Sequence, residues 1–531
     1  MSSVPIFGIS NISSSLKLRD PTLLAAIGDD DSSHHHHQEK QHGVRFPILN
    51  PAATYDEIKD GSSVIATLES MVQADARMLI EKSSDALLSW RDKTTGLKRS
   101  QILSRWSELV KENAHDIAQI MTLESGKPLN ESIGEIAYGT SFLDYYAAEA
   151  MRSNSAGGGS ITPTPFSAVD GSPRGKILAI QEAVGVTAMI TPWNFPIAMI
   201  TRKVGPALAA GCTVLLKPSD LTPLTAIAVQ RLAFRAGLPQ DVFQLIITDR
   251  DHTPEVGNEL CTNPIVKKIS FTGSTAVGKQ LMKIASDTVK RLSLELGGNA
   301  PFIVFDDADL QKTIQAALTS KFRNAGQTCV CADRFLVHES LEEEFTSRLV
   351  TEVNQFRIGL GITVNTDGTT NPNNNLGPLI SDTAVQSVKE KVEEAIAEGA
   401  DCVIGGSTLP NLGPNFFQPT VLRNVSPSSR IWKEETFGPV IAITTFGTEE
   451  EAVHLANDTT TGLASYIFSQ DMDRIFRVGG RLENGMVGVN EGIISTATAP
   501  FGGVKESGLG REGSSVGIAE YLETKYMFIN S

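Results

Sequence analysis

Residues 185–217 read GVTAMITPWNFPIAMITRKVGPALAAGCTVLLK, and this stretch decides the fold. Its first part, 185–191, is rich in β-branched and apolar residues, which is typical of a buried strand. A helical pattern follows over 197–210, and a second apolar run at 213–217 predicts another strand. The chain therefore passes from strand to helix and back to strand, which is the unit from which parallel sheets are built.

The same alternation continues toward the C-terminus. Further elements are expected as strands at 242–248, 266–272 and 290–296, and as helices at 224–236, 255–261 and 276–285. Long helical patterns precede the first strand, at 74–91, 97–119 and 130–151. A second alternating series runs from 301 to about 489. This order predicts an α/β fold with mainly parallel sheets and helices on both faces.

Composition limits the classes of partner. Of the 531 residues, 41% are hydrophobic and 20% are charged, close to the average for globular proteins. The net charge of -15 argues against binding to nucleic acid or to an anionic membrane surface. No apolar run is long enough for a transmembrane helix. Five cysteines are too few for a disulfide framework and favour a reducing compartment.

Two regions differ in composition from the rest of the chain. The first 42 residues contain many serines, three consecutive aspartates and a run of four histidines at 34–37. We expect a mostly disordered tail over 1–45, with the histidines in solvent rather than on a metal. The stretch 367–377 is rich in Asn, Gly, Thr and Pro and is predicted to be a loop.

The sequence GQTCVC at 326–331 contains the strongest candidate nucleophile. Glycine and polar residues around Cys329 indicate a turn, where a thiol can form a covalent adduct with a substrate. The ordinary alternative is a buried thiol that packs as a small hydrophobic residue.

Glu295 lies between two leucines at the end of an apolar strand. Burial raises the pKa of a carboxyl group, which suits such a residue to general-base catalysis. The alternative is a strand-end glutamate that faces solvent. Two glycines follow it and allow another backbone to approach closely.

Two predicted turns carry polar groups at strand ends. The first, FTGSTAVG at 271–278, joins a strand to a helix whose free N–H groups could bind a phosphate. The second, TPWNFP at 191–196, presents the amide of Asn194, which could stabilise an oxyanion. A capped turn and an amide bonded to its own backbone are the alternatives. No histidine lies in a recognisable catalytic motif, which disfavours a Cys–His hydrolase.

Together and in this order, these motifs resemble those of the aldehyde dehydrogenase family, over about residues 46–528. Further similar motifs are ETFGP at 435–439, PFGG at 500–503 and SGLGRE at 507–512. The resemblance is greatest to members that oxidise succinate semialdehyde. The segments behind this narrower resemblance are ITRKVG at 200–205, KFRN at 321–324 and VNEGIIS at 489–495.

The resemblance implies a role for individual residues. Cys329 is expected to attack the aldehyde, Asn194 to hold the oxyanion with the backbone N–H of Cys329, and Glu295 to activate water. The implied substrate is a small aldehyde with a carboxylate, bound by Arg202, Arg323 and Ser495. The implied cofactor is NAD or NADP, without a metal. The residues expected to bind it are Trp193, Lys217, Ser219, Asp220, Gly273, Ser274, Glu435 and Phe437.

The resemblance also implies the architecture. We expect a Rossmann-like cofactor domain formed by 46–160 and 184–296, and a catalytic α/β domain formed by 297–500. A β arm for oligomerisation would combine 161–183 with 505–531, giving a homodimer or homotetramer. A cytoplasmic location is expected, with the mitochondrial matrix as the alternative.

Two departures from the family pattern bear on chemistry. Asp220 stands where NAD-using members usually carry glutamate, and its carboxylate favours NAD because it repels a 2′-phosphate. Asp333 stands where the family usually has asparagine, which adds a charge near the site. A further feature, which resembles some close relatives, is the pair Cys329 and Cys331, for which the resemblance implies reversible oxidation, although such a bond would be strained.

Other functions remain as alternatives at this point. The closest is a dehydrogenase for glutarate semialdehyde or an aminoaldehyde. A CoA-acylating enzyme is disfavoured by Glu295, since such members typically lack this base. A non-catalytic binding or structural member is disfavoured by the presence of Cys329, Glu295 and Asn194.

Overall fold

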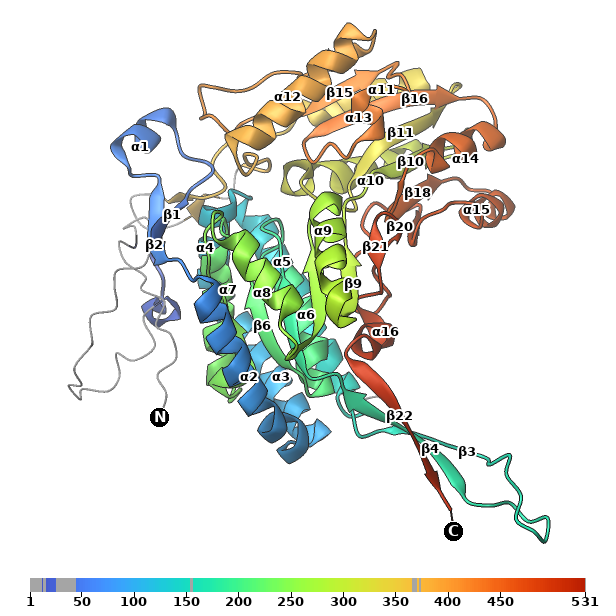
Figure 1. Cartoon of the computed structure of the whole chain (residues 1–531). Coiled ribbons are helices and arrows are strands. Elements are labelled where there is room, and N and C mark those ends of the chain that lie inside the picture. The colour runs from blue at the N-terminus through green and yellow to red at the C-terminus, as the bar shows by residue number, and fades with distance from the viewer. Residues whose placement is uncertain are drawn as a thin grey trace.

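The structure is a computed structural model, and it describes residues 12, 16–24, 44–152, 156–364, 370–371 and 374–530. It contains two large sheets with helices packed against them and a three-stranded sheet that projects from the body (Figure 1). In that view the second large sheet lies above the first. The predicted α/β class with Rossmann-like parallel sheets is confirmed.

The first sheet has the strand order β21-β9-β8-β5-β6-β7 and is parallel except for β21. The chain crosses from one side of β5 to the other after β7. The carboxyl ends of β5 and β8 therefore border a switch point, where dinucleotides bind in folds of this kind. The strands are β5 Val186–Ile190, β6 Thr213–Lys217, β7 Phe243–Leu245, β8 Val266–Thr272, β9 Arg291–Glu295 and β21 Gly508–Leu509.

Eight helices accompany this sheet among the described residues. They are α2 Gln73–Lys93, α3 Gly96–Glu112, α4 Ala114–Ser125, α5 Leu129–Glu149, α6 Ala198–Ala210, α7 Pro223–Arg235, α8 Thr253–Thr262 and α9 Thr275–Ala285. The single helix predicted over 97–119 is wrong, because the chain breaks between α3 and α4. At the break, the Asn113 side chain donates to the carbonyl of Leu109 at 2.8 Å, which competes with the helical bond pattern.

The second sheet has the order β14-β15-β16-β11-β10-β18-β19, with only β14 antiparallel. Its strands are β10 Ala300–Val304, β11 Ala332–His338, β14 Asp401–Ile404, β15 Thr420–Arg423, β16 Val440–Phe446, β18 Ala464–Phe468 and β19 Met486–Val489. Its helices are α10 Leu310–Phe322, α11 Glu342–Val353, α12 Asp382–Ala397, α13 Arg430–Lys433, α14 Glu449–Asn457 and α15 Met472–Gly479. A separate hydrophobic core lies beneath each large sheet.

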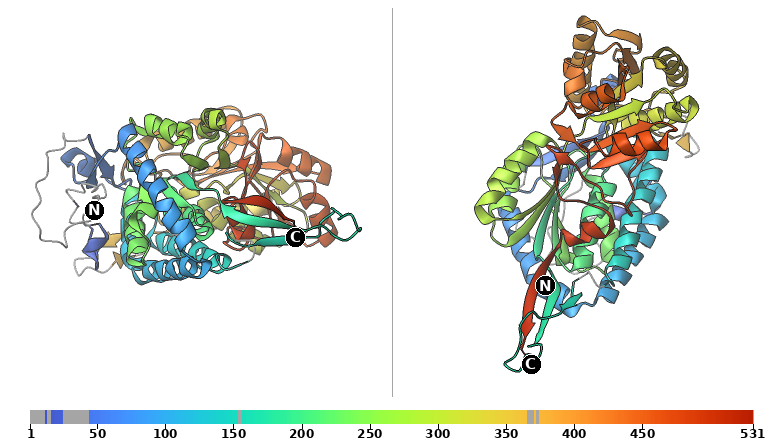
Figure 2. Two further views of the ribbon diagram at one scale, coloured as in Figure 1. Left: turned by 60° about the horizontal axis from the view of Figure 1, so that its bottom comes forward. Right: turned by 90° about the vertical axis from the view of Figure 1, so that its right-hand side faces the viewer.

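The projecting sheet consists of β3 Gly159–Thr162, β4 Lys176–Ala183 and β22 Leu522–Ile529, and we call it the arm. It extends beyond the body in the right-hand view of Figure 2. The residues just before β22 belong to the body rather than to the arm. Strand β21 pairs with β9, and α16 Ser514–Ala519 packs against α5 and α6. This segment also supplies Glu512 and Glu520, which form ion pairs with the buried Lys203 and Lys268.

Part of the N-terminal tail is ordered. A 3-10 turn, η1 Pro21–Leu23, packs against α7 and buries Leu23 and Leu24. Asp20 forms an ion pair with Arg235 of α7 at 2.6 Å. Most of the remaining predicted tail, including the histidines at 34–37, lies outside the described residues.

The smaller elements complete the chain. They are β1 Arg45–Leu49, α1 Tyr55–Asp60, β2 Val64–Glu69, η2 Gln240–Val242, η3 Ser286–Thr288, η4 Arg323–Gly326, β12 Thr363–Val364, β13 Thr370–Asn371, β17 Thr461–Gly462 and β20 Val504–Lys505. The short β13 interrupts the loop predicted at 367–377, part of which lies outside the described residues. No helix in the described part of the chain is long and apolar enough to cross a membrane.

Candidate active site

Cys329 lies in a turn between η4 and β11, as the glycine and polar residues around it predict. Asn324, Ala325 and Gly326 all have positive φ angles, of 52°, 53° and 77°. A side chain on Gly326 would collide with the carbonyl of Gly438, since its Cβ would lie 2.1 Å from that oxygen. The turn therefore requires glycine there, and it leaves Cys329 partly exposed while Cys331 is buried.

The charges around Cys329 act in opposite directions. The pKa of its thiol is raised to about 12, mainly by desolvation, and Glu435 and Glu295 contribute to the rise. Arg202 and Arg323 lower the pKa because they favour the thiolate. The thiol is therefore protonated near neutral pH until a base or an additional cation assists its ionisation.

Glu295 ends β9 and is buried. Its Oε2 atom has no hydrogen-bond partner within the described residues. Burial raises the pKa of Glu295 well above its usual value, the nearby Glu512 raises it further, and Arg202 and Lys203 oppose the shift. A carboxyl group in this state takes up a proton readily, which is the property expected of a general base.

Asn194 follows β5 and is buried beside the nucleophile turn. Its Nδ2 donates to the carbonyl of Gln327 at 3.1 Å, two residues before Cys329. An amide nitrogen has two hydrogens, so the second is available to a substrate oxygen. The structure thus brings the predicted oxyanion donor to the cysteine.

The three residues predicted to bind the substrate carboxylate share a small pocket with Cys329. The other lining residues are Thr328 and Val330, which flank Cys329, and four to which the sequence interpretation gave no part in substrate binding: Tyr138, Phe195, Met199 and Phe501. Phe195 and Phe501 lie in the TPWNFP and PFGG motifs, whereas Tyr138 and Met199 offered no signal, because aromatic and apolar residues within predicted helices are expected in a core. The pocket therefore combines apolar side chains with the polar groups of Arg202, Arg323 and Ser495 and with the hydroxyls of Tyr138 and Thr328.

The two arginines differ in their surroundings. Arg202 is fully buried, forms an ion pair with Glu512 at 2.5 Å and stacks over Phe501 at 4.2 Å. Glu512 also pairs with Lys203, so one carboxylate serves two cations. By contrast, Arg323 has no ion-pair partner within the described ranges, and its guanidinium lies 5.2 Å from the ring of Phe195.

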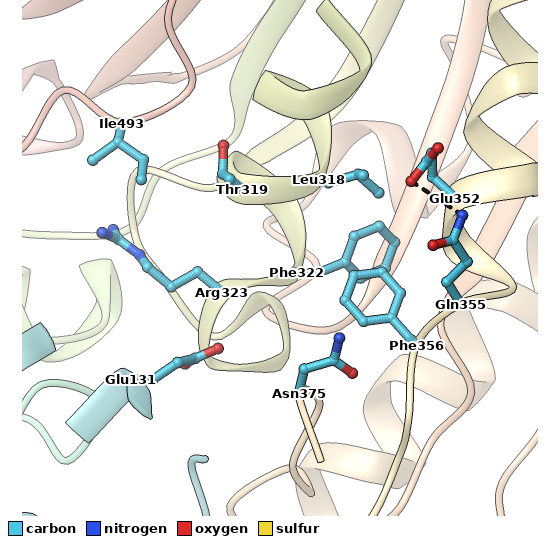
Figure 3. Close-up of a pocket in the computed structure, with 10 residues that line it drawn as sticks. All are labelled: Glu131, Leu318, Thr319, Phe322, Arg323, Glu352, Gln355, Phe356, Asn375 and Ile493. Carbon is cyan, nitrogen blue, oxygen red and sulfur yellow. Dashed lines mark hydrogen bonds between the residues drawn. The ribbon is translucent and has the colours of Figure 1, made fainter. Parts of the chain in front are cut away.

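Arg323 also lines a larger outer cavity, shown in Figure 3. Phe322 and Phe356 line it together, with ring centroids 4.9 Å apart and ring planes tilted by 50°. Glu131 lies on the same wall as Arg323, and burial raises the pKa of its carboxyl to about 7. The outer cavity and the cysteine pocket therefore share one cationic side chain.

The residues predicted to bind the cofactor lie at the carboxyl ends of strands in the first sheet or face them from the second. Lys217 ends β6 and is followed by Ser219 and the half-buried Asp220. Gly273 and Ser274 precede α9, whose first turn Ser274 caps by accepting from Val277 N–H. Their common position at strand ends agrees with a dinucleotide site.

The second sheet contributes Glu435 and Phe437. Glu435 Oε1 accepts the N–H of Gly298 at 3.0 Å, and Phe437 meets Trp193 edge to face with ring centroids 5.7 Å apart. Burial raises the pKa of Glu435 to about 8.

The polar groups present fit a nicotinamide dinucleotide. Lys217 is buried, yet its ammonium has no hydrogen-bond or ion-pair partner in the part of the chain that the structure describes. Burial lowers its pKa, and a hydroxyl ligand would compensate for the desolvation. The N-terminus of α9 can accept a phosphate. No cluster of residues that could hold a metal ion occurs among the described residues.

Asp333 forms a buried ion pair with Lys321 at 2.5 Å. Its other oxygen accepts the N–H of Thr436 at 3.3 Å, next to Glu435. Lys321 therefore neutralises the charge of Asp333. The carboxylate of Asp333 also links the strand that follows the nucleophile turn to the segment that contains Glu435. The thiol of Cys331 donates to the carbonyl of Ser320 at 3.1 Å, and both Cys329 and Cys331 are free.

Comparisons with known proteins agree with the fold. Residues 42–527 match the model of the aldehyde dehydrogenase family. The chain is 50% identical to mitochondrial succinate-semialdehyde dehydrogenase of Arabidopsis thaliana, over 87% of this chain and 84% of that protein. It is 46% identical to glutarate-semialdehyde dehydrogenase of Pseudomonas putida, over 93% and 96%.

Among solved structures, an NADP-dependent enzyme of E. coli matches with a TM-score of 0.84 and 45% identity, over 92% of this chain and 95% of that one. The chain therefore belongs to the aldehyde dehydrogenase family.

Proposed function

We propose that this protein oxidises succinate semialdehyde to succinate with a nicotinamide dinucleotide. The observation that carries the proposal is the pocket in which Cys329 shares a wall with Arg202, Arg323 and Ser495. Two arginines and a hydroxyl suit a carboxylate at the far end of a short aldehyde. The name of the Arabidopsis relative supports the same substrate. Glutarate semialdehyde, one methylene longer, is the second candidate, favoured by the Pseudomonas relative.

The proposed reaction begins when the thiolate of Cys329 attacks the aldehyde carbon. The new oxyanion receives hydrogen bonds from Asn194 Nδ2 and from the backbone N–H of Cys329. The product of the oxidation is a thioester on Cys329. Glu295 then takes a proton from water, which attacks the thioester and releases the acid.

The nicotinamide, when bound, accepts the hydride that leaves the substrate carbon. We assign the adenosine ribose to Lys217 with Ser219 and Asp220, and the pyrophosphate to Gly273 and Ser274. Glu435 would hold the nicotinamide ribose, beside Phe437 and Trp193. We propose NAD as the preferred nucleotide, because the Asp220 carboxylate would repel a 2′-phosphate. NADP, on which the E. coli relative depends, is the competing choice.

We further propose that the arm joins copies of the chain into a homodimer or homotetramer. Exposed apolar side chains on it, including Ile161, Tyr526 and Ile529, support this role. The proposed domains are the cofactor domain at 46–160 and 184–296, the catalytic domain at 297–500 and the arm at 161–183 and 505–531. The protein would act in the cytoplasm or, like the Arabidopsis relative, in mitochondria.

A rate survey tests the proposal. It measures kcat/KM for succinate semialdehyde, glutarate semialdehyde, an aminoaldehyde and butanal, each with NAD and with NADP. Succinate semialdehyde is expected to give the highest value. A preference for butanal or the aminoaldehyde would contradict the proposed role of the arginines.

A further inference from the structure

The two donors of the proposed oxyanion hole come from different sheets. Asn194 follows β5 of the first sheet, while Cys329 precedes β11 of the second. Their separation depends on contacts between two loops, since no single strand or helix carries both. Such donors act only when they lie about 2.7–3.1 Å from the oxygen that they stabilise.

The two loops contact each other directly. Asn194 Nδ2 donates to the carbonyl of Gln327 at 3.1 Å. In return, Asn324 Nδ2 donates to the carbonyl of Asn194 at 3.0 Å. All three side chains are buried, so water does not compete for these bonds.

A buried ion pair supports the Asn194 loop from a third element. Lys127, in the connection between α4 and α5, donates from Nζ to the Asn194 carbonyl at 2.7 Å and to Glu135 Oε2 at 2.5 Å. The other oxygen of Glu135 accepts the N–H groups of Ile197 at 2.9 Å and Ala198 at 3.3 Å. One pair of charges therefore holds both the Asn194 peptide and the start of α6.

The same helix supports the Cys329 loop. Glu131 lies one turn before Glu135 on α5, and its Oε2 accepts the N–H of Asn324 at 2.7 Å. Asn324 and Ala325 both adopt left-handed backbone conformations, which persist only where the surroundings enforce them. Figure 3 shows Glu131 on the wall of the outer cavity, below Arg323.

We infer that Lys127, Glu131 and Glu135 form a positioning cluster that fixes the distance between the two oxyanion donors. The inference rests on the proposed roles of Asn194 and Cys329. These three residues act through the loops that they hold. A displacement of about 1 Å in a catalytic group costs about a hundredfold in rate. Loss of Lys127 is therefore expected to slow the chemical step with little change in binding.

The test measures the single-turnover rate of reduced-nucleotide formation with succinate semialdehyde, together with nucleotide Kd and aldehyde KM. Lys127→Met is expected to lower the rate about a hundredfold while both binding constants stay within about threefold of wild type. Lys127→Arg, which keeps the cation, is expected to recover most of the rate. Arg77→Met is the matched control, because Arg77 pairs with the buried Glu259 at 2.8 Å and contacts neither loop.

A double-mutant cycle shows whether Lys127 acts through Asn194. Asn194→Ala alone is expected to lower the rate about 10²- to 10³-fold. Added to that variant, Lys127→Met should cost less than about threefold. A full hundredfold cost in the double mutant, or an equal loss from Arg77→Met, would overturn the inference.

Two other outcomes separate the inference from the function on which it rests. A wild-type rate in Asn194→Ala would overturn the oxyanion assignment and the inference with it. A slow Asn194→Ala variant together with a fast Lys127→Met variant would overturn the inference alone.

If Lys127→Met does not fold, Glu131→Ala tests the Cys329 loop. A rate about tenfold lower with unchanged nucleotide binding would support the cluster, and an unchanged rate would contradict it.

Discussion

The cofactor side and the substrate side of Cys329 use their charged residues differently. On the cofactor side, the buried ammonium of Lys217 has no partner within the described residues. On the substrate side, Arg202 and Lys203 share Glu512, so that three charges leave a net charge of one. The first side therefore leaves its cation unpaired for a ligand, while the second neutralises one of these two cations with a carboxylate of its own. Arg323 is the exception, since no ion pair among the described residues engages it.

The largest effect on activity is expected from removing the thiol of Cys329, which lies between the cofactor side and the substrate side. Cys329→Ala should lower dehydrogenase activity by about 10⁴-fold or more, because no other residue offers the covalent step. Nucleotide affinity, measured by fluorescence titration, should remain, since Lys217 and Glu435 are untouched. Substantial turnover in this variant, or equal loss in Cys331→Ala, would contradict the assignment of the nucleophile.

The second largest effect on activity is expected from Glu295, whose pKa is shifted by Glu512, Arg202 and Lys203. Glu295→Gln should slow release of the acid by about 10²- to 10⁴-fold, because an amide cannot take a proton from water. Rapid mixing should still show a burst of reduced nucleotide. In the wild type, the raised pKa of Glu295 means that the base form grows as pH rises, so the rate of release should increase with pH. Loss of the burst in the variant would place Glu295 in an earlier step.

Substitutions of the two arginines should have different effects on activity, because Arg202 pairs with Glu512 whereas Arg323 has no ion-pair partner among the described residues. Arg323→Ala should lower kcat/KM for succinate semialdehyde by about ten- to a hundredfold, with much less effect on butanal, because a charged hydrogen bond to the substrate is lost. Arg202→Ala should lower activity on both aldehydes, since it also leaves Glu512 without its partner. Equal losses on both aldehydes in Arg323→Ala would show that Arg323 is structural.

The smallest effect is expected at the edge of the cofactor side. Asp220→Ala should raise the use of NADP relative to NAD by a few-fold to about tenfold. Repulsion between unit charges at 4 Å is of order 4 kcal/mol at an effective dielectric of 20, and partial exposure reduces it. The ratio of kcat/KM values with the two nucleotides measures the change. An unaltered ratio would mean that Asp220 does not face the 2′ position.

Local patterns were enough to predict the five parallel strands of the first sheet, and Asn194 and Glu295 lie at or just after the ends of two of them. The two-residue strand β21 carries no such pattern, and the roles assigned to Asn194 and Glu295 stay predictions. The partners of these residues were beyond reach, because they come from distant parts of the chain. Lys203 and Glu512 are 309 positions apart, and no period or motif links them. The roles of Lys127 and Glu131 were missed for the same reason, since both lie in segments that look like ordinary helix ends.

The segment before the arm has a consequence for synthesis of the chain. The five parallel strands of the first sheet end at residue 295, but Glu512 and Glu520 are synthesised more than two hundred residues later. Until then, Arg202, Lys203 and Lys268 are cations without their counterions, and β9 lacks its outer neighbour β21. The first sheet therefore cannot complete its ion pairs and its edge until the C-terminal segment has been synthesised. A stop codon before Glu512 should yield insoluble protein rather than a shorter working enzyme.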